Sequence, residues 1–580
     1  MNQGRVRPWH LANTTIRNPF RLKGGLEALI ARGYEGHMGK EQEEEIAFAL
    51  DDAEVISLSA STADVTSISR KWRSVLIKLG FIWPDAQMVA KRVGLTQDNL
   101  GAPFTLTPNG RRLLVANSLQ AEQEVILRAL AALQLPSPLE PAYNFSQFSP
   151  LRFVIRILDE LDKSGHESYI SRLEMASIVI LSNGEDRLER IVELIATQRK
   201  RRSASVSKRR FDNLEIGAMA EKNGLGVPGT LFDYQDVTFR YLKATGLFQS
   251  RGRGITLVPE QRKVASLLAS EADIEYSSNE YVVQLAKGAD LPTDSYSGAA
   301  TVLTDLRKVA LEWGVQFDDA LYDLTTPEGT SIARHDLEQL IFEAKEIKYA
   351  EAQPSQIGEI LAYLELLDGN RGYIEFGEEQ LKIPRDERPA YFEWVLWRVL
   401  LAMENLVVPP SEVRRFNVDQ DFLPVSTASG GGADVIGEYE DSVLVVEVTL
   451  TENSRQEAAE GEPVRRHVAD ILERFEPLGK SVYGLFVAKR IDTNTAETFR
   501  IGVWYKRNDE RINLNVVPIT LRQLREMLGR GAATNNLSPS LLIDFVISAS
   551  EIRLAAGGAP EWKSRIADLV MTDGYTLKLD

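Results

Sequence analysis

The strongest constraint on the fold lies between Ala433 and Leu450, where ADVIGEYEDSVLVVEVTL alternates apolar and polar residues on both sides of Glu440-Asp441. Such alternation predicts two antiparallel strands joined by a two-residue turn at these acidic residues. In that register Asp434 lies directly across from Glu447, with Cβ atoms about 5 Å apart. Like charges placed opposite each other destabilise a hairpin, and a divalent cation between them would remove the repulsion.

The ligands available at this hairpin are oxygens. The chain contains no cysteine, which excludes thiolate zinc sites, cysteine nucleophiles and disulfides. Carboxylate oxygens suit Mg²⁺, which binds through one or two carboxylates plus water and substrate phosphate. The alternative interpretation is a solvated sheet edge with no metal. The apolar character of the hairpin and the glycine-rich turn before it, Ser429 to Gly432, favour the metal site.

The segments around the hairpin predict a mixed sheet covered by helices, an α/β arrangement. Before it, apolar residues recur at helical spacing from Phe392 to Met403, with Glu393 beside that face. On the second strand Thr449 shares a face with Glu447. A helix, a strand, a helix, a strand and a last helix at LRQLREML follow. The helix after the hairpin carries Glu462 and His467, and His467 has the alternative of a surface or capping role.

Composition sets the broad class. The chain has 580 residues, a net charge of −16 and 44% hydrophobic residues, which is neither a disordered nor a membrane composition. No apolar run approaches the roughly 20 residues that span a bilayer. We therefore expect a soluble, cytoplasmic protein with no membrane partner. Overall acidity argues against a general polyanion binder, so any contact with nucleic acid depends on local basic patches.

Two basic patches are present. Residues 1–33 carry six basic residues against the single Glu27, and the run from Arg199 to Arg210 carries seven in twelve residues. Serines in that run predict a solvated loop. It is either a flexible charged connection or a contact with a phosphate backbone.

Two segments share a pattern of helix, glycine, short strand, basic turn and short strand, which is typical of a winged helix. In the first, a helix ends near Gly80, and an extended pair and a turn at Pro108-Asn109-Gly110 follow. In the second, a helix spans Val237 to Thr245, and two short strands flank Arg251 to Gly254. Helix-plus-hairpin units also occur as plain packing modules. The predicted DNA contacts are Arg17, Arg21, Arg70, Lys71, Arg73, Arg111, Arg112, Arg199, Lys200, Arg201, Arg202, Arg240, Lys243, Arg251 and Arg253.

These patterns predict a multidomain α+β protein. Residues 1–150 form a basic, winged-helix-like recognition domain, and residues 151–263 form a second one. Residues 264–388 form a helical connecting domain, and residues 389–580 form the domain with the paired acids, after a boundary marked by PRDERP.

Several motifs resemble one known family. They are WHLANTTIRNPFRL, RYLKATGLF, FEWVLW, FLPVSTASGGGADVIGEYEDSVLVVEVTL and EPVRRH. Together they resemble the AlwI-type restriction endonucleases, a type IIS group that includes site-specific nicking relatives and shares its architecture with FokI. The resemblance implies a catalytic domain of the PD-(D/E)xK type. Its metal-binding acids match Asp434 and Glu447, and Glu393 matches the acid of the preceding helix.

The sequence departs from that pattern at two positions. Ala433 stands where the family has proline, and Thr449 stands where the motif usually has lysine. The missing lysine leaves the role of orienting the nucleophile open to His467 or Glu462. These two residues are five apart, which is about 140° around a helix, so both need not face one metal ion.

The resemblance implies a Mg²⁺-dependent type IIS endonuclease that binds a short asymmetric DNA duplex and cuts a few base pairs away, leaving 5′-phosphate ends. Its implied partners are double-stranded DNA, a second copy of the nuclease domain or a small catalytic subunit, and a cognate DNA methyltransferase as genetic partner. The alternatives are a strand-specific nicking subunit, a DNA-binding regulator whose nuclease domain is inactive, and a multi-helical adaptor that binds no DNA.

Overall fold

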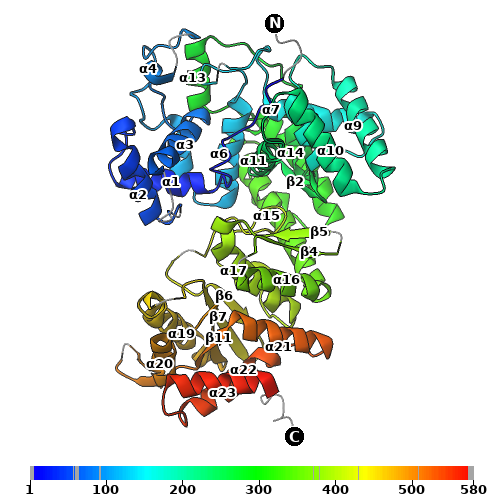
Figure 1. The fold of residues 1–580 in the computed structure, drawn as a ribbon. Helices are drawn as coiled ribbons and strands as arrows, with labels where there is room; N and C mark the ends of the chain where they lie inside the picture. Colours follow the sequence, from blue (N-terminus) through cyan, green and yellow to red (C-terminus); the bar gives the residue numbers. More distant parts are fainter. Residues whose placement is uncertain are drawn as a thin grey trace. The chain divides into compact units, whose positions relative to one another are not determined.

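A computed structural model describes residues 6–572 except 57, 59–63, 90–92, 141, 370, 378, 429, 453 and 507. The protein is a mixed α+β chain that divides into two compact units, Met1–Ile341 and Phe342–Asp580 (Figure 1). Each unit has its own hydrophobic core. No helix in the described part of the chain is long and apolar enough to cross a membrane. The four-segment division expected from the sequence is finer than this split and stays a prediction.

The first part of unit 1 is helical. The expected helix before Gly80 is present as α3, and Gly80 has the positive φ of 72° that favours glycine. The prediction of a chain-reversing turn at Pro108-Asn109-Gly110 is wrong, because these residues begin helix α5. Thr107 caps that helix by accepting a hydrogen bond from the Gly110 N–H, and proline suits its first position. The expected extended pair is a single bridge, Ile82↔Leu106. The helices are α1 (Arg21–Ala31), α2 (Glu43–Asp52), α3 (Val65–Lys78), α4 (Ala86–Val89), α5 (Pro108–Val115) and α6 (Leu119–Ala132).

The second part of unit 1 combines helices with a three-stranded antiparallel sheet of order β1-β3-β2. The expected hairpin around Arg251 to Gly254 is confirmed. The helix before it begins earlier than expected, at Gly229, and ends at Lys243, two residues before the expected Thr245. Its identity as a winged helix stays a prediction. The elements are α7 (Pro150–Lys163), β1 (Ile170–Ser171), α8 (Arg172–Ser177), α9 (Leu188–Ser203), α10 (Lys208–Lys222), α11 (Gly229–Lys243), β2 (Phe248–Arg251) and β3 (Gly254–Leu257).

The basic run from Arg199 to Arg210 is not the solvated loop that its serines predict. Helix α9 continues to Ser203 and α10 begins at Lys208, so only four residues connect the two helices. Two ion pairs with α10 stabilise the basic end of α9 as a helix: Arg201 pairs with Glu215, and Arg202 pairs with Asp212.

The segment expected to be a helical connection also contains a hairpin. Strands β4 (Tyr373–Phe376) and β5 (Glu379–Lys382) pair antiparallel inside residues 264–388. The helices of this stretch are α12 (Arg262–Ser270), α13 (Ser278–Lys287), α14 (Tyr296–Glu312), α15 (Pro327–Ala352) and α16 (Ile357–Asp368).

Unit 2 is built on a mixed sheet, as the sequence predicts, and its four strands have the order β11-β8-β7-β6. Strands β6 and β7 are antiparallel with Val435 opposite Val446, and the Tyr439 N–H donates to the Ser442 carbonyl, which confirms the two-residue turn. Strand β8 lies parallel to β7 and to β11. The strands are β6 (Val435–Glu438), β7 (Ser442–Thr449), β8 (Ser481–Ala488), β9 (Val503–Tyr505), β10 (Arg511–Asn513) and β11 (Val516–Thr520).

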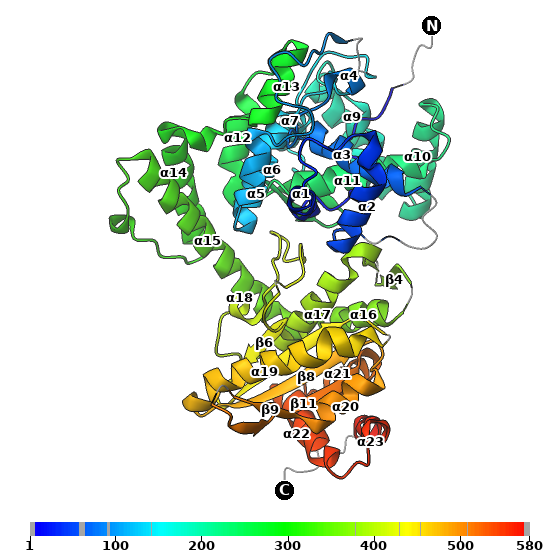
Figure 2. The same cartoon turned by 90° about the vertical axis from the view of Figure 1, so that its left-hand side faces the viewer.

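The helices of unit 2 differ from the prediction in two ways. Helix α17 is buried on all sides from Ala390 to Ala402, rather than along one apolar face. The helix expected to be last, α21, is followed by two more, as Figure 2 shows. The helices are α17 (Arg388–Ala402), α18 (Pro410–Val413), α19 (Glu462–Phe475), α20 (Thr493–Ile501), α21 (Leu521–Ala533), α22 (Pro539–Arg553) and α23 (Ala559–Thr572).

Candidate active site

Asp434 and Glu447 lie side by side, as the hairpin register requires. The Asp434 carboxylate accepts a hydrogen bond of 2.9 Å from the Val448 N–H, which fixes its position at the start of β6. The Glu447 carboxyl interacts with both the backbone and the side chain of Asp434. Glu447 is 6% exposed and Asp434 is half-buried, so the pair does not lie on a fully solvated edge.

Burial and mutual repulsion raise the pKa of both carboxyl groups. Burial, followed by the charge of Glu447, raises the pKa of Asp434 to about 8. Burial, followed by the charge of Glu460, raises the pKa of Glu447 to about 8. The protein therefore keeps these acids together only with protons or with another positive charge nearby.

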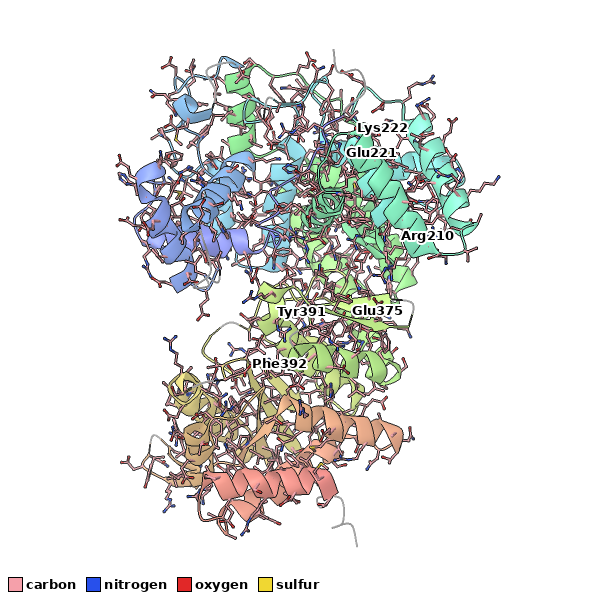
Figure 3. The ribbon with its side chains drawn as sticks, viewed as in Figure 1. Arg210, Glu221, Lys222, Glu375, Tyr391 and Phe392 are labelled. Carbon is pink, nitrogen blue, oxygen red and sulfur yellow. The ribbon has the colours of Figure 1, made fainter. Side chains whose placement is uncertain are left out.

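Glu393 joins this pair from α17, which packs against β6 and β7. Its carboxylate accepts a hydrogen bond of 2.6 Å from the Ala428 N–H. Burial, followed by the charge of Asp434, raises the pKa of Glu393 to about 9. In Figure 3 the labelled neighbours Tyr391 and Phe392 mark this stretch of α17. The structure thus brings together three of the acids proposed from the sequence.

A fourth acid, Glu460, comes from a turn of π-helix, Glu457–Gly461, directly before α19. Burial raises the pKa of Glu460, and its carboxylate is hydrogen-bonded to the Thr449 side chain. The wider π-helical turn is a feature often found at functional sites. The sequence interpretation missed Glu460, although it precedes His467 by seven residues, two helical turns, and so shares its face.

His467 is buried and close to the acids. Its Nδ1 shares a hydrogen bond of 2.7 Å with the Glu447 carboxyl. Its Nε2 is buried and has no hydrogen-bond partner among the described residues. Burial lowers the pKa of His467, which favours a neutral ring at pH 7. A surface or capping role for this histidine is therefore excluded.

Glu462 is not part of this group. Its side chain is 57% exposed and pairs with Arg466 one turn along α19, at 3.2 Å. Because it lies two residues beyond Glu460, it points to a different side of the helix.

Arg415 brings positive charge to the acids. Its guanidinium packs against Gly432, where a Cβ would push the end of the arginine side chain aside, and its charge acts on both Glu447 and His467. Ser429, the first residue of the glycine-rich turn before Asp434, lies outside the described residues. No motif in the sequence pointed to Arg415.

The donor set fits a divalent cation. Two adjacent carboxylates with raised pKa and an unpartnered imidazole nitrogen would all gain from a positive ion between them. Residues 6–572, as far as they are described, hold no preformed cluster of three or more metal-ligating side chains. Mg²⁺ does not need one, because it completes its shell with water and substrate phosphate.

The predicted DNA contacts divide into two groups in unit 1. Many are held by acids of the protein itself: Arg17 by Asp233 and Asp236, Arg70 and Arg73 by Glu43, Arg199 by Glu174, Arg201 by Glu215, Arg202 by Asp212, Arg240 by Asp236 and Arg251 by Glu167. Others donate to neighbouring oxygens: Arg21 to Val55, Arg112 to Lys287 and Lys243 to Ser250. Arg73 is only 10% exposed, so it is unsuited to contact DNA. Exposed side chains of the set are Arg70, Lys71, Arg111, Arg112, Lys200, Arg201, Arg251 and Arg253.

Comparison with known proteins gives a family match. The model of the AlwI restriction endonuclease family matches residues 77–527. Among solved structures, the small subunit (R.BspD6I2) of the heterodimeric restriction endonuclease R.BspD6I is 24% identical, with 36% of this chain and 97% of that chain covered and a TM-score of 0.27. Restriction endonuclease FokI is 10% identical, with 93% and 98% covered and a TM-score of 0.25. No curated protein matches the chain. The family match confirms the resemblance carried by the sequence motifs.

Proposed function

We propose that this chain, which belongs to the AlwI restriction endonuclease family and is a type II site-specific deoxyribonuclease, binds a short asymmetric duplex sequence and cleaves a few base pairs outside it. This is the behaviour of a type IIS enzyme. The single observation that carries the cleavage site is the cluster of buried and half-buried acids, Glu393, Asp434, Glu447 and Glu460, beside His467. That group lies in unit 2, whereas the basic helix-and-hairpin elements lie in unit 1. Such separation supports cleavage at a distance from the recognised sequence.

Asp434 and Glu447 are the residues that would hold Mg²⁺. When bound, the ion would polarise the scissile phosphate and lower the pKa of the attacking water. The chain's own groups hold and move the proton: Glu447 orients the His467 ring through Nδ1, which leaves Nε2 free to accept a proton from the water. Attack at phosphorus breaks the bond to the 3′ oxygen, so the products carry 5′-phosphate and 3′-hydroxyl ends.

Thr449 stands where the motif usually has lysine, and Arg415 supplies the positive charge that this lysine would bring. We expect Arg415→Ala to lower the cleavage rate by about 100-fold to 1000-fold, the usual effect of removing one donor from a developing negative charge. Arg415→Lys keeps the charge and should recover part of that loss. The measurement is single-turnover cleavage of plasmid DNA, with the exposed Arg522→Ala of the same unit as control. Equal rates for wild type and Arg415→Ala would contradict the role.

One catalytic group cuts one strand. Double-strand cleavage therefore requires a second copy of the nuclease unit or a separate small catalytic subunit, and a chain without such a partner nicks. A cognate DNA methyltransferase would be its genetic partner, because the host's own copies of the sequence need protection. Incubation with supercoiled plasmid and Mg²⁺ tests the proposal, and linear fragments or open circles with a constant end position support it.

Thr449 favours one other candidate, a DNA-binding regulator whose nuclease unit is inactive. It predicts sequence-specific binding with no strand breaks in any divalent metal, and binding that Asp434→Ala leaves unchanged. The plasmid assay separates the two candidates, because a regulator leaves the supercoiled DNA intact at every protein concentration.

The raised pKa values predict that the metal-free protein loses thermal stability as the pH rises from about 4 to about 8. Asp434 and Glu447 have a pKa of about 8 when folded, whereas carboxyl groups of an unfolded chain titrate near pH 4. The folded state therefore binds more protons than the unfolded state in this window, so the free energy of unfolding falls as pH rises. Thermal melting in EDTA measures the slope. Asp434→Asn should flatten it, and an unchanged slope would contradict the assignment.

A further inference from the structure

We infer that the exposed face of α10 reads base edges in the major groove of duplex DNA. The inference rests on the proposed function and names the surface of unit 1 that recognises the sequence. It replaces α11, the helix before the basic hairpin, which carries the predicted DNA contacts Arg240 and Lys243.

Helix α11 is covered by the N-terminal segment of the chain. Arg17 pairs with Asp233 and Asp236 of this helix, at 2.8 and 3.1 Å. The Tyr241 hydroxyl donates to the Ile16 carbonyl at 3.1 Å, and the rings of His10 and Tyr234 lie 4.6 Å apart. A helix whose side chains already contact another segment of its own chain cannot also place them against base edges.

Helix α10 is the most exposed helix near the basic hairpin, and only Ile216 and Ala220 of its described residues are buried. Two ion pairs fix its orientation, since Asp212 and Glu215 bind Arg202 and Arg201 of α9. The side facing away from these pairs carries residues at spacings i, i+3, i+4, i+7 and i+11, which form a stripe about 17 Å long. The residues of this stripe are Arg210, Asn213, Leu214, Gly217 and Glu221.

The first turn of α10 is basic, and Arg210 is its cation on the stripe. Lys208, Arg209 and Arg210 are exposed, and among the described residues their side chains have no hydrogen-bond or ion-pair partner. Asp212 and Glu215, the acids nearest to these cations, are already paired with α9, and the stripe carries one acid, Glu221, at its far end. Figure 3 shows Arg210 at one end of α10, with Glu221 and Lys222 at the other. Groove-reading helices place their N-terminal residues on base edges, where arginine pairs with guanine and asparagine with adenine.

Gly217 is an independent indication that a ligand approaches this face. A Cβ built at this position meets no atom of the protein within 4 Å, so packing in the chain does not require glycine. Glycine in the middle of a helix is unfavourable compared with alanine. A missing side chain at the centre of the stripe would let the helix backbone come close to the floor of a groove.

The test is a binding selection, which needs no cleavage. Full-length protein without added metal is mixed with a randomised pool of DNA duplexes, and the bound DNA is sequenced. Wild type should enrich one motif. Arg210→Ala and Asn213→Ala should each lose the preference at one base pair and weaken binding to the wild-type motif about 10-fold to 100-fold. Arg187→Ala, an arginine with 83% of its side chain exposed just before α9, should keep the motif.

A second pair of variants tests the close approach without removing charge. Gly217→Gln should weaken binding to the selected motif while its melting temperature stays at or above that of wild type. Gly529→Gln is the matched control, because Gly529 also lies within a helix, α21 of unit 2, and a Cβ there also meets nothing within 4 Å. It should bind like wild type.

The outcomes that overturn the inference are specific. Unchanged preference in Arg210→Ala and Asn213→Ala, a uniform loss on all sequences, or wild-type binding by Gly217→Gln would each exclude base reading by α10. If wild type makes no strand breaks but still enriches a motif that these variants lose, the nuclease proposal fails and the assignment of α10 stands.

Discussion

Asp434→Asn is expected to lower the DNA cleavage rate by about 1000-fold or more, because it removes a carboxylate whose metal-dependent charge stabilisation amounts to several kcal/mol. The fold should tolerate the change, since the asparagine carbonyl can still accept the hydrogen bond from the Val448 N–H. In EDTA the variant should melt at a higher temperature than wild type, because a buried charge next to Glu447 has been removed. Plasmid cleavage with Mg²⁺ and thermal melting with EDTA measure the two effects.

The matched control is Asp441→Asn, which changes an exposed aspartate at the tip of the same hairpin. It should cleave at the wild-type rate and melt at the wild-type temperature. Near-wild-type cleavage by Asp434→Asn would show that the buried acids do not form the catalytic centre. A large fall in the melting temperature of this variant in EDTA would show that the acids stabilise each other rather than repel.

The second large effect distinguishes two acids that are two residues apart. Glu460→Gln should reduce cleavage by about 100-fold or more, as expected for loss of a charged group that acts on the reacting centre. Its carboxyl is half-buried, its charge acts on Glu447, and it is hydrogen-bonded to Thr449. Glu462→Gln should cleave at the wild-type rate, because it removes only an exposed ion pair with Arg466. Single-turnover cleavage of both variants on one plasmid provides the comparison.

DNA binding serves as the control for this pair, and both variants should bind the recognised duplex as wild type does. The reverse result, with Glu462→Gln inactive and Glu460→Gln active, would show that the π-helical turn does not place Glu460 at the centre. Loss of cleavage in both variants would point to the integrity of α19 as the common cause.

The hairpin at the centre of the site could be predicted because the residues that determine it are adjacent in the sequence. Alternating side chains determine which face of each strand is buried, and a two-residue turn then leaves one register for the pair. Val435 lies opposite Val446 as that register requires, which also brings Asp434 to Glu447. The same periodicities predicted α19, β8, α20 and α21, but not the separate pair β9 and β10 or the last two helices.

Predictions failed where a short polar or basic stretch allowed two structures. Pro108-Asn109-Gly110 has the composition of a turn, but Thr107 caps it as the first turn of a helix. The run from Arg199 to Arg210 resembles a solvated loop, but acidic partners on α10 keep most of it helical. In both cases the deciding contact is a cap or an ion pair that periodicity does not reveal.

By itself the sequence determined the paired carboxylates, the mixed sheet and the membership of a nuclease family, because these depend on side-chain alternation and on motifs contiguous in the chain. Only the tertiary structure decided which other groups join the pair. Packing of α17 and α19 against β7 places Glu393 and His467 beside the pair. The π-helical turn places Glu460 there, and not Glu462. Gly432, which has no side chain, lies against the Arg415 guanidinium. Contacts between residues far apart in the chain depend on how buried surfaces fit together, and that fit has no local periodicity.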